Sequence, residues 1–154
     1  MKSYMQKWKR LVVILLCSIM FGFGIMIAIS GIHYAKAGNH LHDISAAIQK
    51  YAESFGYGVV RELVGHGIGT HLHEDPQIPN FKTIGRGIRL RPGMTLAIEP
   101  MITMGDYAVS VLDDDWTVVT DDNSLAAHYE NTVLITDGDP EILTLPNWDK
   151  KEWQ

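Results

Sequence analysis

The sequence predicts an α+β fold preceded by an apolar helix, and three observations predict it. Residues 11–32 carry no charged side chain, residues 42–55 repeat apolar side chains at helical spacing, and short apolar runs separated by turn residues follow from residue 57. At 154 residues the chain can bury one ordinary core. We therefore expect three parts: an N-terminal segment (1–34), one domain (35–145) and a tail (146–154).

The apolar run 11–32 is long enough to cross a membrane. As a helix its 22 residues would rise about 33 Å, against a hydrocarbon core of about 30 Å. The preceding cations Lys2, Lys7, Lys9 and Arg10 would keep the N-terminus in the cytoplasm and place the domain outside. Two alternatives remain open. Ala35 and Ala37 have the small-x-small spacing of a signal-peptidase site, and the run could be no working membrane segment at all.

Residues 42–55 are predicted to form an amphipathic helix, which Gly56 ends. Its apolar face consists of Ile44, Ala47, Ile48, Tyr51, Ala52 and Phe55. Strands are predicted at 57–63, 95–104, 116–120 and 125–136, with the last two forming an antiparallel hairpin about a turn at 121–124. Turns are also expected at 36–39 and at Pro92-Gly93.

The segment 63–79, LVGHGIGTHLHEDPQIP, holds three histidines within eight residues and too many glycines and prolines for a helix. It is predicted to be a loop. Gly65, Gly67 and Gly69 allow either a positive φ or a close approach to a neighbouring segment. His66, between two of these glycines, suits a metal ligand or a proton shuttle. The alternative is a solvated, histidine-rich loop.

Two acids interrupt apolar strands and need an explanation, because buried carboxylates require a cation or several donors. Glu99 shares a strand face with Ala97, opposite Leu96 and Ile98, and precedes Pro100, which ends ladder pairing. Glu130 shares a face with His128 and Thr132. With His66 these acids would supply one nitrogen and two oxygen ligands, a donor set typical of a catalytic metal site. His73 and His128 are then candidates to contact a ligand or the substrate, whereas Asp113-Asp114-Asp115 is predicted to be a solvated loop.

The charge distribution argues against a nucleic-acid partner. The formal net charge is -5, but residues 35–154 hold nine cations and eighteen acids, and 9 − 18 gives -9. A phosphate backbone needs a basic face, which this body lacks.

Several motifs occur in an order that resembles the C-terminal half of a type I methionine aminopeptidase. They are KAGNHLHDISAAIQKYAESFGYG, VVRELVGHGIGTHLHEDPQIPNF, RPGMTLAIEPMI, WTVVT and AAHYENTVLIT, and the resemblance covers about residues 36–144. The resemblance implies half of the pita-bread fold, in which a curved antiparallel sheet is backed by helices.

The resemblance also implies roles for particular residues. His66, Glu99 and Glu130 match metal ligands, His73 matches a histidine that contacts the substrate and steadies the tetrahedral intermediate, and Leu72 and Trp116 fall near the pocket for the methionine side chain. The reaction would remove the N-terminal methionine from nascent chains near the ribosome, in the cytoplasm. It would use Co²⁺, Mn²⁺, Fe²⁺ or Zn²⁺.

The chain departs from the family pattern at its N-terminal end. The family has two further ligands, both aspartates, in its N-terminal half, whereas this chain has no acid before Asp43. We therefore expect one ion at most and impaired or absent activity in this chain alone. Two alternatives follow: a half-enzyme completed by a separate N-terminal half, or a non-catalytic, membrane-tethered binder of metal or peptide. Residues 1–34 could also come from a frameshift or truncation.

Overall fold

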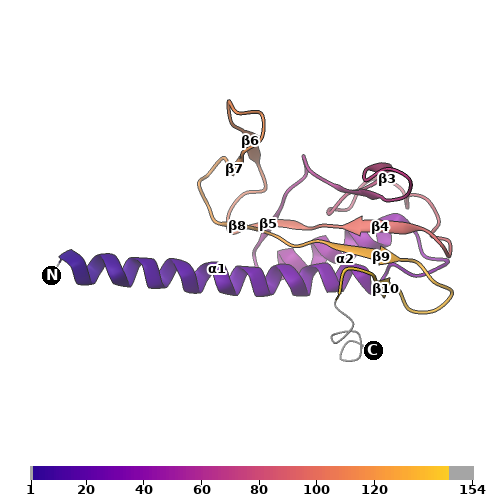
Figure 1. Ribbon diagram of the computed structural model, residues 1–154, viewed down its shortest axis with the longest axis horizontal. Coiled ribbons are helices and arrows are strands. Elements are labelled where there is room, and N and C mark those ends of the chain that lie inside the picture. The colour runs from indigo at the N-terminus through magenta and orange to yellow at the C-terminus, as the bar shows by residue number, and fades with distance from the viewer. Residues whose placement is uncertain (1, 146–154) are drawn as a thin grey trace.

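The computed structural model describes the backbone of residues 2–145 and the side chains of residues 12–145. The predicted tail, 146–154, lies outside the described residues. Two helices, α1 (Lys2–Ile32) and α2 (Leu41–Ser54), lie on one side of the sheets, and the β6–β7 hairpin projects from the other side (Figure 1). The strands of the described chain are β1 (Gly58–Val59), β2 (Gly65–Gly67), β3 (Glu74–Ile78), β4 (Thr95–Ile98), β5 (Met101–Thr103), β6 (Val109–Val111), β7 (Val118–Thr120), β8 (Ala126–His128), β9 (Asn131–Leu134) and β10 (Glu141–Ile142).

All strand pairs in the described chain are antiparallel. A five-stranded sheet has the order β10-β9-β4-β2-β3, a three-stranded sheet has the order β1-β5-β8, and β6 pairs with β7 alone. The prediction of an antiparallel sheet backed by helix is therefore confirmed.

Two long strands predicted from the sequence are each broken in the middle. The run 95–104 divides into β4 and β5 at Glu99-Pro100, and the run 125–136 divides into β8 and β9 at Tyr129-Glu130. Each run thus passes from one sheet to the other, β4 pairing with β9 and β5 with β8. The Tyr129 amide donates to the Pro100 carbonyl at 3.3 Å, so the two breaks lie side by side.

The predicted hairpin between 116–120 and 125–136 is wrong, because β7 pairs with β6 instead. The β6–β7 connection is short, and the Leu112 amide closes it by donating to the Thr117 carbonyl at 2.8 Å. Asp115 takes a positive φ of 55° in this connection.

Two further predictions need correction. The strand predicted at 57–63 is reduced to β1. The segment 63–79, predicted to be a loop, contains β2 and β3, which pair with an irregular register after His66. Period-two patterning could not reveal β2, because two of its three residues are glycine.

The core lies between the helices and the sheets. The predicted helix 42–55 is confirmed by α2, whose Ile44, Ile48 and Ala52 are fully buried, and Gly56 follows it with a φ of 77°. The sheet contributes Leu96, Ile98, Ile102 and Val133 to this core. The C-terminal part of α1 belongs to it too, because Ile27, Ala28 and Ile32 are buried.

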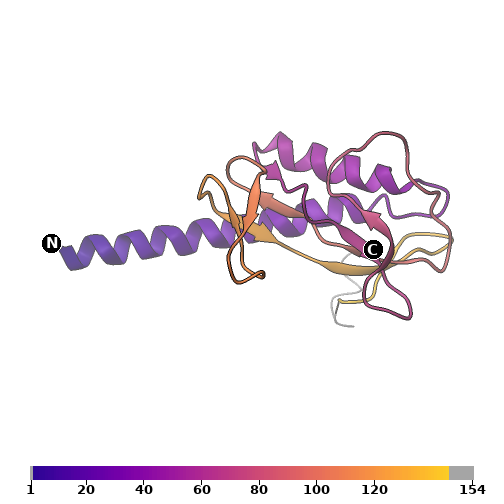
Figure 2. The ribbon, with the colours of Figure 1, turned by 90° about the horizontal axis from the view of Figure 1, so that it is seen from above.

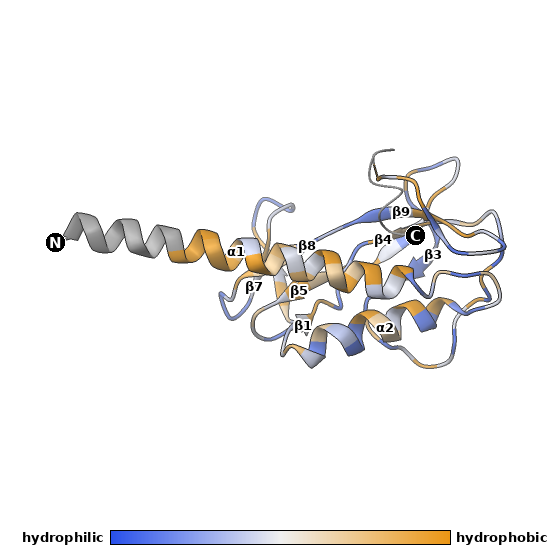
Figure 3. Cartoon of the chain, turned by 90° about the horizontal axis from the view of Figure 1, so that it is seen from below, coloured by the Kyte–Doolittle hydropathy of each residue, from blue (hydrophilic) through white to orange (hydrophobic). Residues whose placement is uncertain are grey.

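Helix α1 continues well beyond the sheets at its N-terminal end (Figure 2). The described side chains in its projecting part, from Val12 onward, are largely apolar (Figure 3), with Val12, Val13, Ile14, Leu15 and Ile19 exposed. By length and composition alone, Val12–Ile32 could cross a membrane, with a mean hydropathy of 2.8. Part of this stretch is nevertheless core helix. The division of the chain after residue 34 stays a prediction.

Candidate metal centre

His66 lies on β2, an interior strand of the five-stranded sheet, opposite Gln77 on β3 and Ala97 on β4. The glycines beside it are needed for close approach rather than for a positive φ. A Cβ atom at Gly65 would collide with the Ala97 carbonyl, and one at Gly67 would collide with the Asp75 carbonyl. Of the two reasons that the sequence left open for these glycines, the close approach is the correct one.

The imidazole of His66 is oriented by its own strand. Its Nδ1 lies 2.9 Å from the Gly67 carbonyl oxygen. Because a carbonyl can only accept a hydrogen bond, Nδ1 carries the proton and Nε2 keeps its lone pair. That Nε2 lies 3.6 Å from Oε1 of Glu99, and both side chains are largely shielded, with 13% and 14% of their surfaces exposed. The ring of His73 lies beside the ring of His66, with 4.2 Å between the centroids.

Glu99 is held at the break between β4 and β5. Its backbone carbonyl accepts a hydrogen bond of 3.2 Å from the side-chain amide of Asn80, which is completely buried. Sequence reasoning missed Asn80. The signal was a lone amide side chain in the apolar surroundings of Ile78, Pro79 and Phe81.

Glu130 and His128 lie at the break between β8 and β9, and their side chains approach the carboxylate of Glu99. One ligand atom from each of Glu99, His128 and Glu130 lies within 4.8 Å of the other two. Nε2 of His128 lies 3.3 Å from Oε2 of Glu99. This hydrogen bond is the largest influence on the His128 pKa, which is raised above its usual 6.5; the negative charges of Glu99 and Glu130 add to it, and partial burial opposes it.

His66 contacts Glu99, but the group whose ligand atoms all lie within 4.8 Å of one another joins Glu99 and Glu130 to His128, so the three-ligand set His66, Glu99 and Glu130 stays a prediction. The carboxylate of Glu99 has His66 Nε2 on one oxygen and His128 Nε2 on the other. The donors are imidazole nitrogen and carboxylate oxygen, which suit Zn²⁺, Fe²⁺, Co²⁺ or Mn²⁺. Two carboxylates this close repel one another, and a cation between them removes that repulsion. The residues present therefore fit a divalent ion.

The two residues predicted near a methionine pocket lie on projecting connections. Leu72, between β2 and β3, is 68% exposed, and Trp116, between β6 and β7, is 86% exposed. Both connections stand on the side of the sheets away from the helices (Figure 1). The roles predicted for Leu72 and Trp116 stay predictions.

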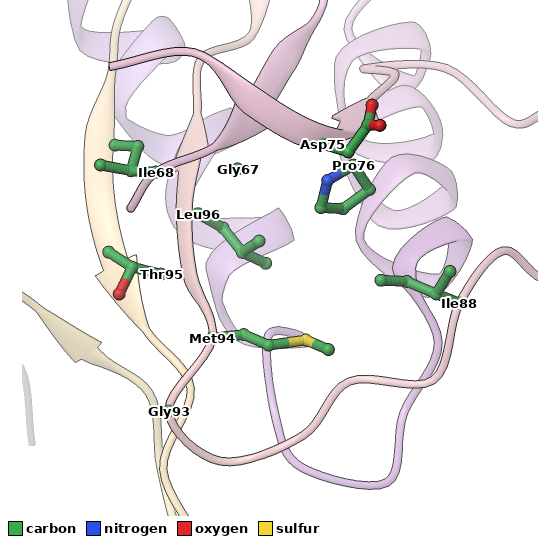
Figure 4. Close-up of a pocket in the computed structure, with 9 residues that line it drawn as sticks. All are labelled: Gly67, Ile68, Asp75, Pro76, Ile88, Gly93, Met94, Thr95 and Leu96. Carbon is green, nitrogen blue, oxygen red and sulfur yellow. The ribbon is translucent and has the colours of Figure 1, made fainter. Parts of the chain in front are cut away.

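A cavity of about 380 Å³ lies beside the other face of β2 and β4 (Figure 4). It is lined by Gly67, Ile68, Asp75, Pro76, Ile88, Gly93, Met94, Thr95 and Leu96. This lining contains none of the side chains of the metal centre.

Imidazole and carboxylate donors gathered on an antiparallel sheet are typical of metallohydrolases. The chain belongs to one family of them, metallopeptidase family M24, whose model matches residues 26–137. A methionine aminopeptidase of Clostridium acetobutylicum is 63% identical over 115 residues, which are 75% of this chain and 46% of that protein. Methionine aminopeptidase 1 of Bacillus subtilis is 53% identical over 114 residues, again 46% of that protein. The chain thus spans about half the length of these relatives.

Solved structures confirm the predicted fold, half of a pita-bread architecture. The crystal structure of a methionine aminopeptidase from Thermotoga maritima aligns with a TM-score of 0.80 at 49% identity, covering 84% of this chain and 52% of that one. A prolidase from Pyrococcus furiosus aligns with a TM-score of 0.62 at 22% identity, over 84% of this chain and 33% of that one. The second similarity shows the fold alone.

Proposed function

We propose that this chain supplies the metal-binding half of a methionine aminopeptidase site and acts on the N-terminal methionine of nascent peptides. His66, Glu99 and Glu130 would hold one divalent ion, and a separate N-terminal half would supply the two remaining carboxylate ligands. The observation that carries this proposal is the approach of both His66 and the His128–Glu130 pair to the single carboxylate of Glu99. The identity to methionine aminopeptidases over the same residues supports the choice of substrate.

The residues of this half-site have distinct tasks in the proposal. When bound, a divalent cation supplies Lewis-acid chemistry, acidifying water and polarising a carbonyl group. His66 presents Nε2 as a ligand because the Gly67 carbonyl fixes its tautomer. Asn80 holds the backbone of Glu99 at the strand break, which keeps the carboxylate in the cluster. His73, beside His66, would donate a hydrogen bond to the substrate carbonyl.

The donor set favours a transition metal over Mg²⁺ or Ca²⁺, because those two ions prefer oxygen ligands alone. We therefore propose Co²⁺, Mn²⁺, Fe²⁺ or Zn²⁺ as the ion, with one ion per chain.

The test is metal stoichiometry together with hydrolysis of a Met-Ala-Ser peptide, measured on the chain alone and after mixing with the N-terminal half of the C. acetobutylicum relative. We expect one ion or fewer without turnover in the chain alone, and turnover after mixing. Two ions per chain with turnover in the unmixed sample would refute the half-site. A mixture that stays inactive, despite one bound ion, would refute the completion by a second polypeptide.

A second candidate function is a membrane-tethered binder of metal or peptide. It is favoured by the exposed apolar stretch 12–19 of α1, which follows four cations and no acid. A complete span through Ile32 would withdraw Ile27, Ala28 and Ile32 from the core. The exposed apolar stretch among the described side chains, residues 12–19, rises about 12 Å and would enter one leaflet.

Vesicle co-sedimentation separates this candidate from a chain that works in the cytoplasm. Vesicles with anionic lipid should retain the chain, and the double variant Ile14→Lys/Leu15→Lys should release it while α2 and the sheets stay folded. If the unmodified chain stays in the supernatant, the membrane candidate is refuted and the cytoplasmic location proposed from its relatives is favoured.

A further inference from the structure

The nitrogen donor that lies closest to both carboxylates is not the predicted ligand His66. In the described part of the chain, the group of metal-ligating side chains whose ligand atoms all lie within 4.8 Å of one another is Glu99, His128 and Glu130. His66 touches this group through Glu99 alone among the contacts at the centre. The imidazole that lies within reach of both carboxylates is therefore that of His128.

The separation between His128 Nε2 and Oε2 of Glu99 is that of two ligands on one ion, whereas His66 Nε2 approaches the other oxygen, Oε1. Nitrogen and oxygen ligands bind such ions at about 2.0–2.2 Å, which places neighbouring donor atoms about 3.0–3.5 Å apart. The observed separations are 3.3 Å for His128 Nε2 and 3.6 Å for His66 Nε2.

The backbone holds His128 in this position. His128 ends β8, where it pairs with Met101 on β5, directly beyond the break that carries Glu99. Tyr129, the next residue, is fixed by its hydrogen bond to the Pro100 carbonyl and by an edge contact with Phe21 of α1. The ring itself is 47% exposed, so solvent and ions can reach it.

We propose that His128 is a direct metal ligand, through Nε2, and that the ion in this chain is held by two imidazoles and two carboxylates: His66, Glu99, His128 and Glu130. This inference rests on the proposed function, since it concerns the same ion. His128 would add a fourth ligand from this chain, and the carboxylates of the separate N-terminal half would complete the site.

The probe is Co²⁺, added to the metal-free full chain and to the variants His128→Gln and His33→Gln. His33, an exposed histidine directly after α1, serves as the matched control. X-ray absorption should count two imidazoles on Co²⁺ in the unmodified chain and in His33→Gln, and one in His128→Gln. Co²⁺ affinity should fall at least 100-fold in His128→Gln alone.

An equal imidazole count in His128→Gln and the unmodified chain would overturn the inference, because His128 would then only orient Glu99. If His128→Gln does not fold, ring ¹⁵N shifts in the unmodified chain decide: Zn²⁺ should shift Nε2 of both His66 and His128, and a shift in His66 alone would overturn the inference. A chain that binds neither ion refutes the proposed function as well. Binding that Glu99→Gln abolishes but His128→Gln leaves unchanged refutes the inference alone.

Discussion

Glu99 and Glu130 lie at matching breaks in two neighbouring antiparallel runs of chain. Ile98 pairs with Asn131 on one side of the breaks, and Met101 pairs with His128 on the other. The residues between these pairs leave the ladder, and both breaks carry an acid. The bend of the sheet and the gathering of the carboxylates are therefore the same structural feature, since each acid sits where its strand changes sheet.

The first prediction concerns the charge of Glu130. Glu130→Gln should weaken binding of Zn²⁺ by at least 100-fold, because a neutral amide replaces a charged ligand. The same substitution should stabilise the metal-free protein by up to roughly 1 kcal/mol, since it removes the repulsion with Glu99. Urea unfolding in EDTA and in Zn²⁺ measures both effects. Glu62→Gln, at an exposed acid outside the cluster, should change neither; parallel losses in both variants would contradict the prediction.

The second prediction concerns the pKa of His128 in the metal-free chain. The hydrogen bond to Glu99 and the nearby negative charges raise this pKa above 6.5. A raised pKa means that the folded state prefers the protonated ring, so the resulting stability is fully present below about pH 6.5 and is lost as the pH rises through the folded-state pKa. NMR titration should show the raised value, and Glu99→Gln should lower it. A His128 pKa at or below 6.5 in the unmodified chain contradicts this account.

The spacing of apolar residues along the sequence predicted the elements in which burial repeats regularly. The helical spacing of Ile44, Ile48 and Ala52 predicted α2, and the alternation of Leu96 and Ile98 against Glu99 predicted which side of β4 faces the core. His66, Glu99 and Glu130 could be singled out because a histidine between glycines and an acid in an apolar strand are both locally costly.

Those patterns did not predict which strands pair or which residues distant in the sequence contact one another. The pairing of β7 with β6 involves a partner strand that the patterns did not predict, and the extent of β2 depends on neighbours that pass close to Gly65 and Gly67. Asn80 supports Glu99 across 19 residues of sequence, and His128 reaches Glu99 only because the two breaks align. Neither contact can be inferred from spacing along one strand.

The third prediction tests whether α1 is part of the core. A Cβ atom at Gly31 would lie 2.5 Å from Cγ1 of Ile48 and 2.8 Å from its Cδ1, whereas one at Gly22 would meet nothing within 4 Å. Gly31→Ala should therefore destabilise the protein by about 1–3 kcal/mol through overpacking. Gly22→Ala, the same change in the same helix, should stabilise it by up to about 1 kcal/mol through helix propensity. Urea unfolding compares them, and equal effects of the two substitutions would refute close packing of α1 on α2.

The fourth prediction concerns the connection that carries Trp116. Asp114 accepts hydrogen bonds from the Thr117 hydroxyl, from the Thr117 amide at 2.8 Å and from the Trp116 amide at 3.1 Å. Thr117 is the main cause of the lowered pKa of Asp114, so Thr117→Val should raise that pKa toward 3.8 in an NMR titration. Asp114→Ala should speed amide exchange at Trp116 and Thr117 by roughly tenfold, because the turn loses its acceptor. Asp113→Ala, one residue earlier, is the control, and a similar acceleration there would mean that the acidic run as a whole, rather than Asp114, orders the connection that presents Trp116.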